Sequence, residues 1–389
     1  MNIAFLFFRP LDPHIGGVER VTDILTKELK SRGYNIEYLV FRKIENIGDL
    51  ATDIYYFPDP EIYVTEKNKK FYTRFIKEHK IDICVLQEPR FCAGIFDLFP
   101  TQNCKLVSVY HGGPAGDLCF YWKNSLRKHT SNFDYCLKYI PRLFLRALYK
   151  IRLNKVLSNS INEAIRKSDA IVYLSDKFIP DFKLVHIIPD NRKFYYIGNP
   201  STYIIPDEIP KKEKIILFVG RMVPHKNPDL IIRIWNKIAP DYPDWKILFI
   251  GEGPMIDYCK NQFNCSNNIE FLGQRDPEDF YKKASILCMA SNNEGWGMVL
   301  VEAMSMGCVP IVFESFRSIN DIIEHNKNGI LVKPFSRKLY RKGLRNLIDN
   351  DDFRRSLAEN AMGKVKEFAP KIIVEKWIQL FEKVMSHEG

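Results

Sequence analysis

Apolar, strand-like runs alternate with helical patterns along the 389-residue chain, and this alternation begins twice. The first series opens at residues 2–8 and the second at 214–219, after a polar, proline-marked stretch over 198–214. Strands that alternate with helices predict parallel sheets covered by helices on both faces. We therefore expect an α/β protein with two doubly wound, Rossmann-like domains that face a central cleft and divide near residue 205. The predicted strands lie at 2–8, 35–41, 81–86, 105–110, 169–175, 214–219, 245–251, 269–272, 286–290, 309–313 and 329–333, with helical patterns between them such as 18–29, 228–238 and 276–283.

The overall composition limits the classes of protein and of partner. A hydrophobic content of 46% provides for two cores, and a net charge of +10 favours anionic partners such as a nucleotide, a phospholipid surface or a nucleic acid. The first residues lack the basic segment of a signal peptide, and no apolar run reaches the roughly 18 residues of a membrane span, so we expect a cytoplasmic protein. The nine cysteines show no paired spacing, which disfavours disulfides and a zinc site.

Each domain carries a candidate phosphate site after its first strand, at the edge where doubly wound sheets bind ligands. In the N-terminal domain, Gly16 and Gly17 precede the helical pattern 18–29. Backbone N–H groups there, at the positive end of a helix, could meet an anion. An ordinary glycine turn explains this pair at least as well.

The second candidate phosphate site lies in "VGRMVPHKNP", residues 219–228. Gly220 permits a sharp exit from the strand, and Arg221 and Lys226 lie before a helix that Pro228 opens. Two cations at the carboxyl edge of a sheet could neutralise a diphosphate without a metal, the arginine through its planar fork and the lysine as a point charge. A solvated basic loop is an equal alternative for this motif taken alone.

The stretch "NNEGWGMVLVEAMSMG", residues 292–307, contains two glutamates around a glycine turn. The helical pattern that begins at Met298 is apolar nearly all round, which predicts a buried helix. We expect Glu302 in the first turn of that helix, where the positive end of the dipole favours an ionised carboxylate. Glu294 lies on the preceding loop and could reach a ligand. A helix-terminal charge and a solvated loop acid are the respective alternatives.

Taken in order, these motifs resemble those of the retaining nucleotide-sugar glycosyltransferases of family 4, which have the GT-B fold. They are the glycine pair after the first strand, Gly-Arg-x4-Lys at 220–226, "GEGP" at 251–254 and Glu-x7-Glu at 294–302. The resemblance extends over essentially the full chain and is strongest over 214–333.

This resemblance implies an architecture and a reaction. The architecture is an N-terminal acceptor-side domain over 1–205, a C-terminal donor-binding domain over 206–368 and a final segment, 369–389, whose helix returns to the N-terminal domain. The reaction is transfer of a sugar from a nucleoside diphosphate, UDP in our prediction, to a hydroxyl of a glycan or lipid-linked oligosaccharide, with retention, in the synthesis of surface polysaccharide. A non-catalytic nucleotide-sugar-binding subunit and a GT-B epimerase or phosphorylase are the alternatives.

The resemblance also implies roles for the motif residues. Glu302 accepts both ribose hydroxyls, Glu294 contacts hydroxyls of the donor sugar, and the backbone amides of 297–299 hold the distal phosphate. Arg221 and Lys226 stabilise the leaving diphosphate in place of a metal ion, so we expect no metal and no cofactor besides the nucleotide sugar. The predicted donor site comprises Gly16, Gly17, Gly220, Arg221, Lys226, Gly251, Gly253, Glu294, Gly297, Met298, Val299 and Glu302, and the residues predicted to act in catalysis are Glu294, Arg221, Lys226 and His111.

His111 follows the strand-like run 105–110 and precedes two glycines. It resembles the family histidine that lies beside the anomeric carbon and the acceptor, whereas a histidine of the core or of a turn is the alternative. We do not assign it as a general base. In the front-face mechanism usually proposed for this family, the departing phosphate oxygen takes the acceptor proton and no side chain is the nucleophile.

Two departures from the family pattern leave the donor sugar open. Where members often carry a glycine pair about three residues before an acid, this chain has Arg317 and Ser318 before Asp321. Trp296 is also bulkier than the phenylalanine that is common in its place.

The acceptor side falls in the N-terminal half, where 138–157 interleaves basic residues with apolar and aromatic ones. Such a pattern suits a basic amphipathic helix on an anionic membrane surface, with the protein peripheral to the membrane. A helix with one face on its own domain and a solvated basic side is nearly as good an explanation. No module that reads a groove or stacks on bases is recognisable, so we expect no nucleic-acid partner.

Overall fold

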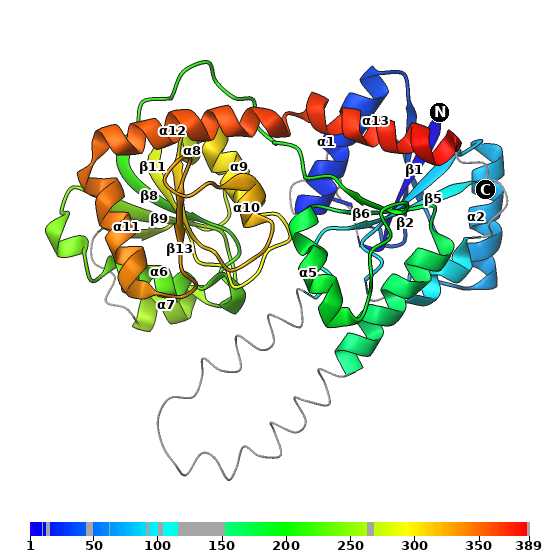
Figure 1. Ribbon diagram of the computed structural model, residues 1–389, viewed down its shortest axis with the longest axis horizontal. Coiled ribbons are helices and arrows are strands. Elements are labelled where there is room, and N and C mark those ends of the chain that lie inside the picture. The colour runs from blue at the N-terminus through cyan, green and yellow to red at the C-terminus, as the bar shows by residue number, and fades with distance from the viewer. Residues whose placement is uncertain are drawn as a thin grey trace, which may run out of the picture. The chain divides into compact units, whose positions relative to one another are not determined.

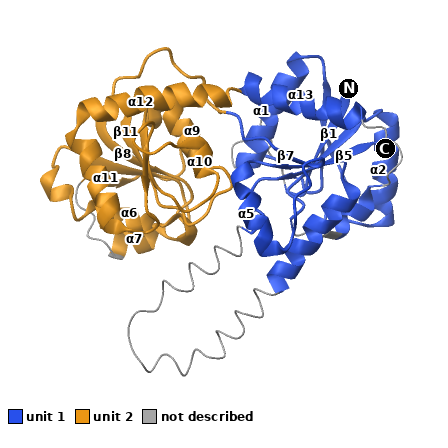
Figure 2. Cartoon of the chain, in the orientation of Figure 1, with its two compact units in different colours: residues 1–200, 370–389 blue, residues 201–369 orange. Residues whose placement is uncertain are grey.

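The computed structural model divides the chain into two compact units (Figure 2). The N-terminal unit comprises residues 1–200 and 370–389, and the C-terminal unit comprises 201–369. Each is built on one parallel sheet with helices packed on it, which confirms the predicted fold class of two α/β domains. The structure describes residues 1–9, 11–12, 16–43, 50–61, 63–90, 93–99, 104–115, 152–262 and 268–386.

The N-terminal unit contains a seven-stranded sheet in the order β3-β2-β1-β4-β5-β6-β7, in which every pairing is parallel. Its order reverses between β1 and β4. The elements are β1 (Asn2–Phe7), α1 (Gly17–Ser31), β2 (Asn35–Val40), β3 (Ile54–Tyr56), α2 (Glu66–Glu78), β4 (Ile83–Gln87), η1 (Ala93–Leu98), β5 (Lys105–Tyr110), a helix over 152–167, β6 (Ala170–Tyr173), η2 (Asp176–Phe178), α5 (Ile179–Phe182), η3 (Lys183–Val185), β7 (Phe194–Tyr196) and α13 (Pro370–Ser386).

Helix α1 shows why the last helix of the chain belongs to the N-terminal unit (Figure 1). One face of α1 buries Val21, Leu25 and Leu29, and the helix packs on β2 and on α13. Just past the end of α1, the guanidinium of Arg32 forms an ion pair with Glu375 of α13 at 2.6 Å. An exposed pair of this kind stabilises little, so the apolar faces of the two helices carry the association.

The C-terminal unit contains a six-stranded parallel sheet in the order β10-β9-β8-β11-β12-β13, which reverses between β8 and β11. Helices α8, α9 and α12 form one packed layer, and α6, α7 and α11 form another. The elements are β8 (Glu213–Val219), η4 (Pro224–Lys226), α6 (Pro228–Trp235), η5 (Ala239–Asp241), β9 (Lys246–Ile250), α7 (Ile256–Gln262), β10 (Ile269–Phe271), α8 (Glu278–Lys283), β11 (Ala284–Met289), α9 (Met298–Ser305), β12 (Val309–Phe313), α10 (Ile319–Ile322), β13 (Ile330–Val332), α11 (Arg337–Asp349), α12 (Asp351–Val365) and η6 (Lys366–Phe368).

Every strand predicted from the sequence is present, with ends that differ by at most two residues, and two strands within the described ranges were missed. The missed strands, β3 and β7, are three residues long and lie at the two edges of the N-terminal sheet. The predicted basic helix over 138–157 lies outside the described residues up to 151, and its last part begins the helix over 152–167. Among the described residues, no helix is long and apolar enough to cross a membrane.

Lys212 ties the α8–α9 layer to the strand β8 that it precedes. Its ammonium donates to the backbone oxygens of Tyr281 at 3.0 Å, Lys282 at 2.9 Å and Met306 at 2.5 Å. The first two carbonyls lie in the last turn of α8, and the third caps the end of α9.

We predict that Lys212→Met lowers the free energy of unfolding by about 1–3 kcal/mol, because it leaves carbonyl groups without their donor at the ends of two helices. The measurement is the denaturant midpoint of the purified variant. The matched control is Lys211→Met, since Lys211 is exposed, and it should leave the midpoint unchanged. An equal effect of the two substitutions would contradict the assignment.

Candidate active site

The loop after β8 is held against the loop after β9 by direct backbone approach. Gly220 donates its N–H to Ile250 O at 3.0 Å, and Met222 donates to Glu252 O at 2.7 Å. A Cβ on Gly251 would lie 2.2 Å from Gly220 O, and one on Gly253 would lie 2.5 Å from Met222 O. Glycine is therefore required at 251 and 253 by close packing of the loop that carries Arg221, which gives both residues a structural role.

Asn227 joins the loop after β8 to the loop after β11, at the point where the strand order reverses. It has a left-handed backbone, with φ 50°, and its buried side-chain amide donates to Ala290 O at 2.7 Å and to Asn292 Oδ1 at 2.8 Å. The N–H of Asn292 in turn donates to His225 O at 2.8 Å. These bonds fix the two loops beside each other at the carboxyl edge of the sheet.

The consequence is an ion pair between Lys226 and Glu294, two residues that the sequence predicted for one site. The side chains keep only 19% and 14% of their surface exposed, so both charges are held in a partly desolvated position. Arg221 lies exposed in the same β8 loop. Burial, followed by the nearby Lys226 charge, lowers the pKa of His225 below its ordinary value, so His225 adds no cation at neutral pH.

Two serines attach the Glu294 loop to the loop after β12. Ser315 donates to Ser291 O at 2.5 Å, and Ser318 donates to Gly295 O at 2.7 Å. Ser318 stands where a glycine was expected from the family pattern, and its side chain is fully buried against the Glu294 loop. Ser318, although it departs from the family pattern, therefore helps to position the loop that carries Glu294.

Helix α9 begins where it was predicted, but Glu302 does not lie in its first turn. Gly297 is the N-cap, with φ 94°, and helical residues run from Met298, so Glu302 is in the second turn. The predicted stabilisation by the helix dipole is wrong, because that effect is confined to the first turn. Hydroxyl groups hold the carboxylate instead: Thr202 donates at 3.1 Å and Tyr281 at 3.2 Å, and the residue is 3% exposed.

Gly297, Met298 and Val299 form the start of α9, and the N-cap glycine has no side chain with which to cap the helix. Trp296, directly before them, packs its ring edge-on against Phe368, with the centroids 5.5 Å apart. Trp296 is only 4% exposed, so its ring is buried.

In the N-terminal unit, Gly16 is the N-cap of α1 and Gly17 its first residue. The N–H of Gly16 already donates to Asp12 O at 3.2 Å. The carboxylate of Glu19 covers the glycine so closely that a Cβ on Gly16 would lie 1.7 Å from its Oε2. The positive end of α1 thus faces a carboxylate of the chain itself, and burial raises the pKa of that Glu19 carboxyl.

His111 follows β5 in the same unit. Its backbone N–H donates to Glu88 Oε2 at 2.9 Å, and its Nε2 lies 2.6 Å from Gln87 Oε1. Burial lowers the pKa of His111 to about 4, although the Glu88 carboxylate opposes this shift. The imidazole is therefore neutral at physiological pH.

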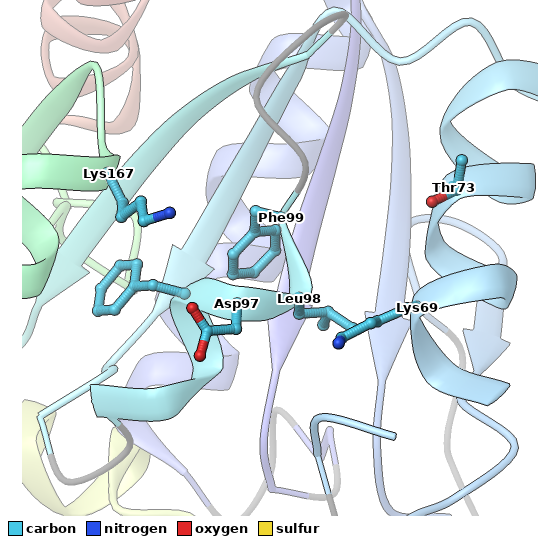
Figure 3. Close-up of a pocket in the computed structure, with 7 residues that line it drawn as sticks. Lys69, Thr73, Asp97, Leu98, Phe99 and Lys167 are labelled. Carbon is cyan, nitrogen blue, oxygen red and sulfur yellow. The ribbon is translucent and has the colours of Figure 1, made fainter. Parts of the chain in front are cut away.

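Two cavities among the described residues are lined by no residue predicted for catalysis or donor binding. The cavity in the N-terminal unit, about 400 Å³, lies between α2, η1 and the end of the helix over 152–167 (Figure 3). The other, about 620 Å³, lies beside α10 and α12. In the described ranges, no group of three or more His, Cys, Asp or Glu side chains could hold a metal ion.

Sequence reasoning missed Asn227, Ser315 and Gln87 as parts of the site. A signal for Asn227 was present, since asparagine tolerates a left-handed backbone and directly precedes Pro228, which opens a helix. Gln87 and Ser315 had no comparable signal, because each acts through a contact with a residue distant in the sequence.

Comparison with known proteins gives a family match for the C-terminal unit. Residues 202–364 match the family model described as glycosyl transferases group 1. An uncharacterized glycosyltransferase of Methanocaldococcus jannaschii, MJ1069, is 28% identical, with 96% of each chain covered. An uncharacterized glycosyltransferase of Haemophilus influenzae is 23% identical over 93% of this chain and 95% of its own. An alpha-1,4-N-acetyl-D-galactosaminyltransferase of Campylobacter jejuni, named for a PP-undecaprenol substrate, is 26% identical over 59% of this chain and 68% of its own.

Solved structures resemble the whole chain. A mutant of S. aureus TarM, in complex with Fondaparinux, alpha-GlcNAc-glycerol and UDP, is 16% identical over 98% of this chain and 99% of its own, with a TM-score of 0.74. HepE of Anabaena, in complex with UDP, is 16% identical over 98% of this chain and 100% of its own, with a TM-score of 0.71. These likenesses identify the fold as GT-B.

We predict that Gly251→Ala lowers the free energy of unfolding by more than about 2 kcal/mol, since a φ of 129° and a carbonyl oxygen at 2.2 Å both oppose a Cβ. Denaturant unfolding of the full chain measures this. Gly363→Ala is the control, because a Cβ there meets nothing within 4 Å in helix α12 and should be neutral or stabilising. A neutral Gly251→Ala would show that the loop can move away.

Proposed function

We propose the reaction that the chain catalyses from the match of residues 202–364 to the group 1 glycosyl transferases. It transfers a sugar from a nucleoside diphosphate, with UDP our first choice, to a hydroxyl of a glycan or lipid-linked oligosaccharide. The anomeric configuration of the sugar is retained, and no metal ion takes part. UDP is supported by its presence in the complexes of TarM and HepE, which share the fold.

The observation that carries the proposal is the Lys226–Glu294 ion pair at the point where the strand order of the C-terminal sheet reverses. Ligands of doubly wound sheets bind outside the carboxyl ends of the strands at such a point. The cation Lys226 suits the anionic diphosphate on one side of the bond to be broken. The anion Glu294 suits the hydroxyl donors of the sugar on the other side.

In the proposed mechanism the donor exchanges the partners within this pair. Lys226 turns to the diphosphate and is joined by Arg221 from the same loop, while Glu294 accepts hydrogen bonds from hydroxyls of the transferred sugar. The backbone amides of 297–299 hold the distal phosphate, and Glu302, which two hydroxyl groups hold in place, accepts the ribose hydroxyls.

Bond making and bond breaking then occur on one face of the sugar. The bond from the anomeric carbon to the phosphate oxygen breaks, and the acceptor oxygen forms the new bond to that carbon. The departing phosphate oxygen takes the acceptor proton. Positive charge fixed beside the leaving group stabilises the charge that develops on it, which is the contribution otherwise supplied by a metal ion.

For the acceptor, we propose a lipid-linked oligosaccharide of a surface-polysaccharide pathway, bound by the protein as a peripheral membrane component. The substrate in the name of the Campylobacter jejuni relative supports this class. The basic and aromatic composition of 138–157 also supports an anionic membrane surface as a partner.

We predict that one family of nucleotide sugars raises the melting temperature of the protein and is slowly hydrolysed, and that Lys226→Ala abolishes this stabilisation. Loss of the cation should reduce the rate of sugar release by about 100- to 1,000-fold, the usual effect of removing one charge-stabilising donor. The measurement is a thermal-shift and hydrolysis screen with UDP-, GDP-, ADP- and CMP-sugars. Glu294→Gln should bind the nucleotide but release sugar slowly.

The control for net charge is Lys237→Ala, an exposed lysine of the same unit, which should behave as the unchanged protein. The double variant Lys226→Met/Glu294→Gln controls for a charge left unpaired, since it removes both. Binding by the unchanged protein without release or transfer to any acceptor would favour a binding subunit. No response to any nucleotide would refute the site.

We also predict that transfer proceeds at an unchanged rate in excess EDTA, because fixed cations replace the metal, and that the product keeps the anomeric configuration of the donor. Proton NMR of the product, through the coupling constant of the anomeric proton, gives the configuration. A rate lost in EDTA and restored by Mg²⁺ or Mn²⁺ would refute metal independence, and an inverted product would refute retention.

A further inference from the structure

A chain of three polar side chains runs from His111 into the interior of the N-terminal unit. His111 Nε2 lies 2.6 Å from Gln87 Oε1, Gln87 Nε2 donates to Thr22 Oγ1 at 3.3 Å, and the Thr22 hydroxyl donates to Val18 O at 2.9 Å. Gln87 is 4% exposed and Thr22 is fully buried. His111 directly follows β5, Gln87 ends β4 and Thr22 lies in α1, so no local motif produces the arrangement.

The direction of these bonds determines which imidazole nitrogen carries the proton. The Thr22 hydroxyl donates its single proton to Val18 O, so its oxygen can only accept a hydrogen bond from Gln87. The Gln87 amide must then present N–H to Thr22 and its oxygen to His111. An oxygen facing Nε2 requires a proton on Nε2, because two acceptors cannot pair.

The other nitrogen of the ring is consequently a bare acceptor. Nδ1 of His111 is buried and has no hydrogen-bond partner among the described residues. The charged groups around the ring are Glu88, which accepts the backbone N–H of His111, and Arg90, which pairs with Glu88 at 2.9 Å and packs over Gly112. Because these opposite charges largely offset each other, burial dominates and the ring stays neutral.

We propose that Gln87 is a positioning residue, which with Thr22 behind it holds His111 as the Nε2–H tautomer, so that Nδ1 accepts a hydrogen bond from a sugar hydroxyl. The identity of that hydroxyl donor rests on the proposed function, whereas the tautomer does not. An imidazolium ring, or the Nδ1–H tautomer, would instead carry a proton on Nδ1. That nitrogen could then not accept a hydrogen bond from the sugar hydroxyl. Gln87 thereby determines which ring nitrogen of His111 donates and which accepts, a choice that the sequence alone leaves open.

The tautomer is tested first, by two-bond ¹H–¹⁵N correlation NMR of the full chain labelled with ¹⁵N-histidine. The chain has eight histidines, and His111→Asn identifies the signals of His111. We expect a protonated Nε2 and an unprotonated Nδ1 throughout pH 5.5–8. An Nδ1–H tautomer, or titration of the ring near its ordinary pKa, would overturn the proposal.

The positioning role is tested by substitution of Gln87. In Gln87→Leu we expect mixed tautomers and a kcat lower by about 10- to 100-fold, a smaller loss than removal of the imidazole, with the KM for donor unchanged. Gln87→Glu places a carboxylate on Nε2–H, which favours imidazolium and raises the pKa of His111. The acidic limb of the pH–rate profile should then move to higher pH by about 1 to 3 pH units.

Controls separate this role from a structural one. Thr22→Val removes the acceptor behind Gln87 without a change in shape and should also mix the tautomers, which keeps the test valid if Gln87→Leu fails to fold. Ser108→Ala removes a buried hydrogen bond between Ser108 of β5 and Ser168. Neither serine belongs to the His111–Gln87–Thr22 series, so this variant should leave the tautomer unchanged. Normal kcat in a variant with mixed tautomers would refute the positioning role. A protein without transferase activity but with the expected tautomer would refute the proposed function and leave the assignment of Gln87 standing on the NMR result.

Discussion

The proposed donor site depends on the hydrogen bonds made by one side chain, that of Asn227. A buried amide is costly unless its hydrogen bonds are made, and this one makes two, to Ala290 O at 2.7 Å and to Asn292 Oδ1 at 2.8 Å. Both partners belong to the loop after β11, so the loop after β8 cannot shift without breaking them. Lys226 directly precedes the asparagine, and Glu294 lies two residues beyond its second partner. The hydrogen bonds of the Asn227 amide thus determine how close Lys226 and Glu294 lie.

The Lys226–Glu294 ion pair also explains how two charged side chains can be kept in a partly buried position. A lone lysine or glutamate with less than a fifth of its surface exposed would lose much of its hydration, whereas a paired one regains part of that energy. In the proposed mechanism, Lys226 and Glu294 therefore compensate each other's charge until the donor supplies new partners. Such a site favours a ligand that carries both an anion and hydroxyl donors, since either alone would leave one member of the pair unsatisfied.

The sequence contained enough information for the central strands and the charged motifs, and too little for what connects them. Runs such as that of β1 are apolar throughout because a central parallel strand is buried on both faces, so they could be predicted. The edge strands β3 and β7 are too short to produce a pattern. The first residue of α9 was predicted correctly, but Glu302 is the fifth residue of the helix and so lies just beyond the first turn to which it was assigned. Gln87 and Asn227 could not be ranked above other polar residues, since their roles depend on partners distant along the chain.

The C-terminal unit brings charged side chains together, whereas the N-terminal unit holds a neutral imidazole. The contacts around each account for this difference. In the C-terminal unit the loops bring formal charges together and leave Arg221 exposed beside them, which suits recognition of an anion. In the N-terminal unit the group that contacts Nε2 of His111 is the uncharged amide of Gln87, and the carboxylate that faces the backbone of His111 is paired with Arg90. A neutral ring whose pKa is about 4 does not change its charge between pH 5.5 and 8. The directionality that we propose Gln87 and Thr22 give to the ring therefore persists over that range.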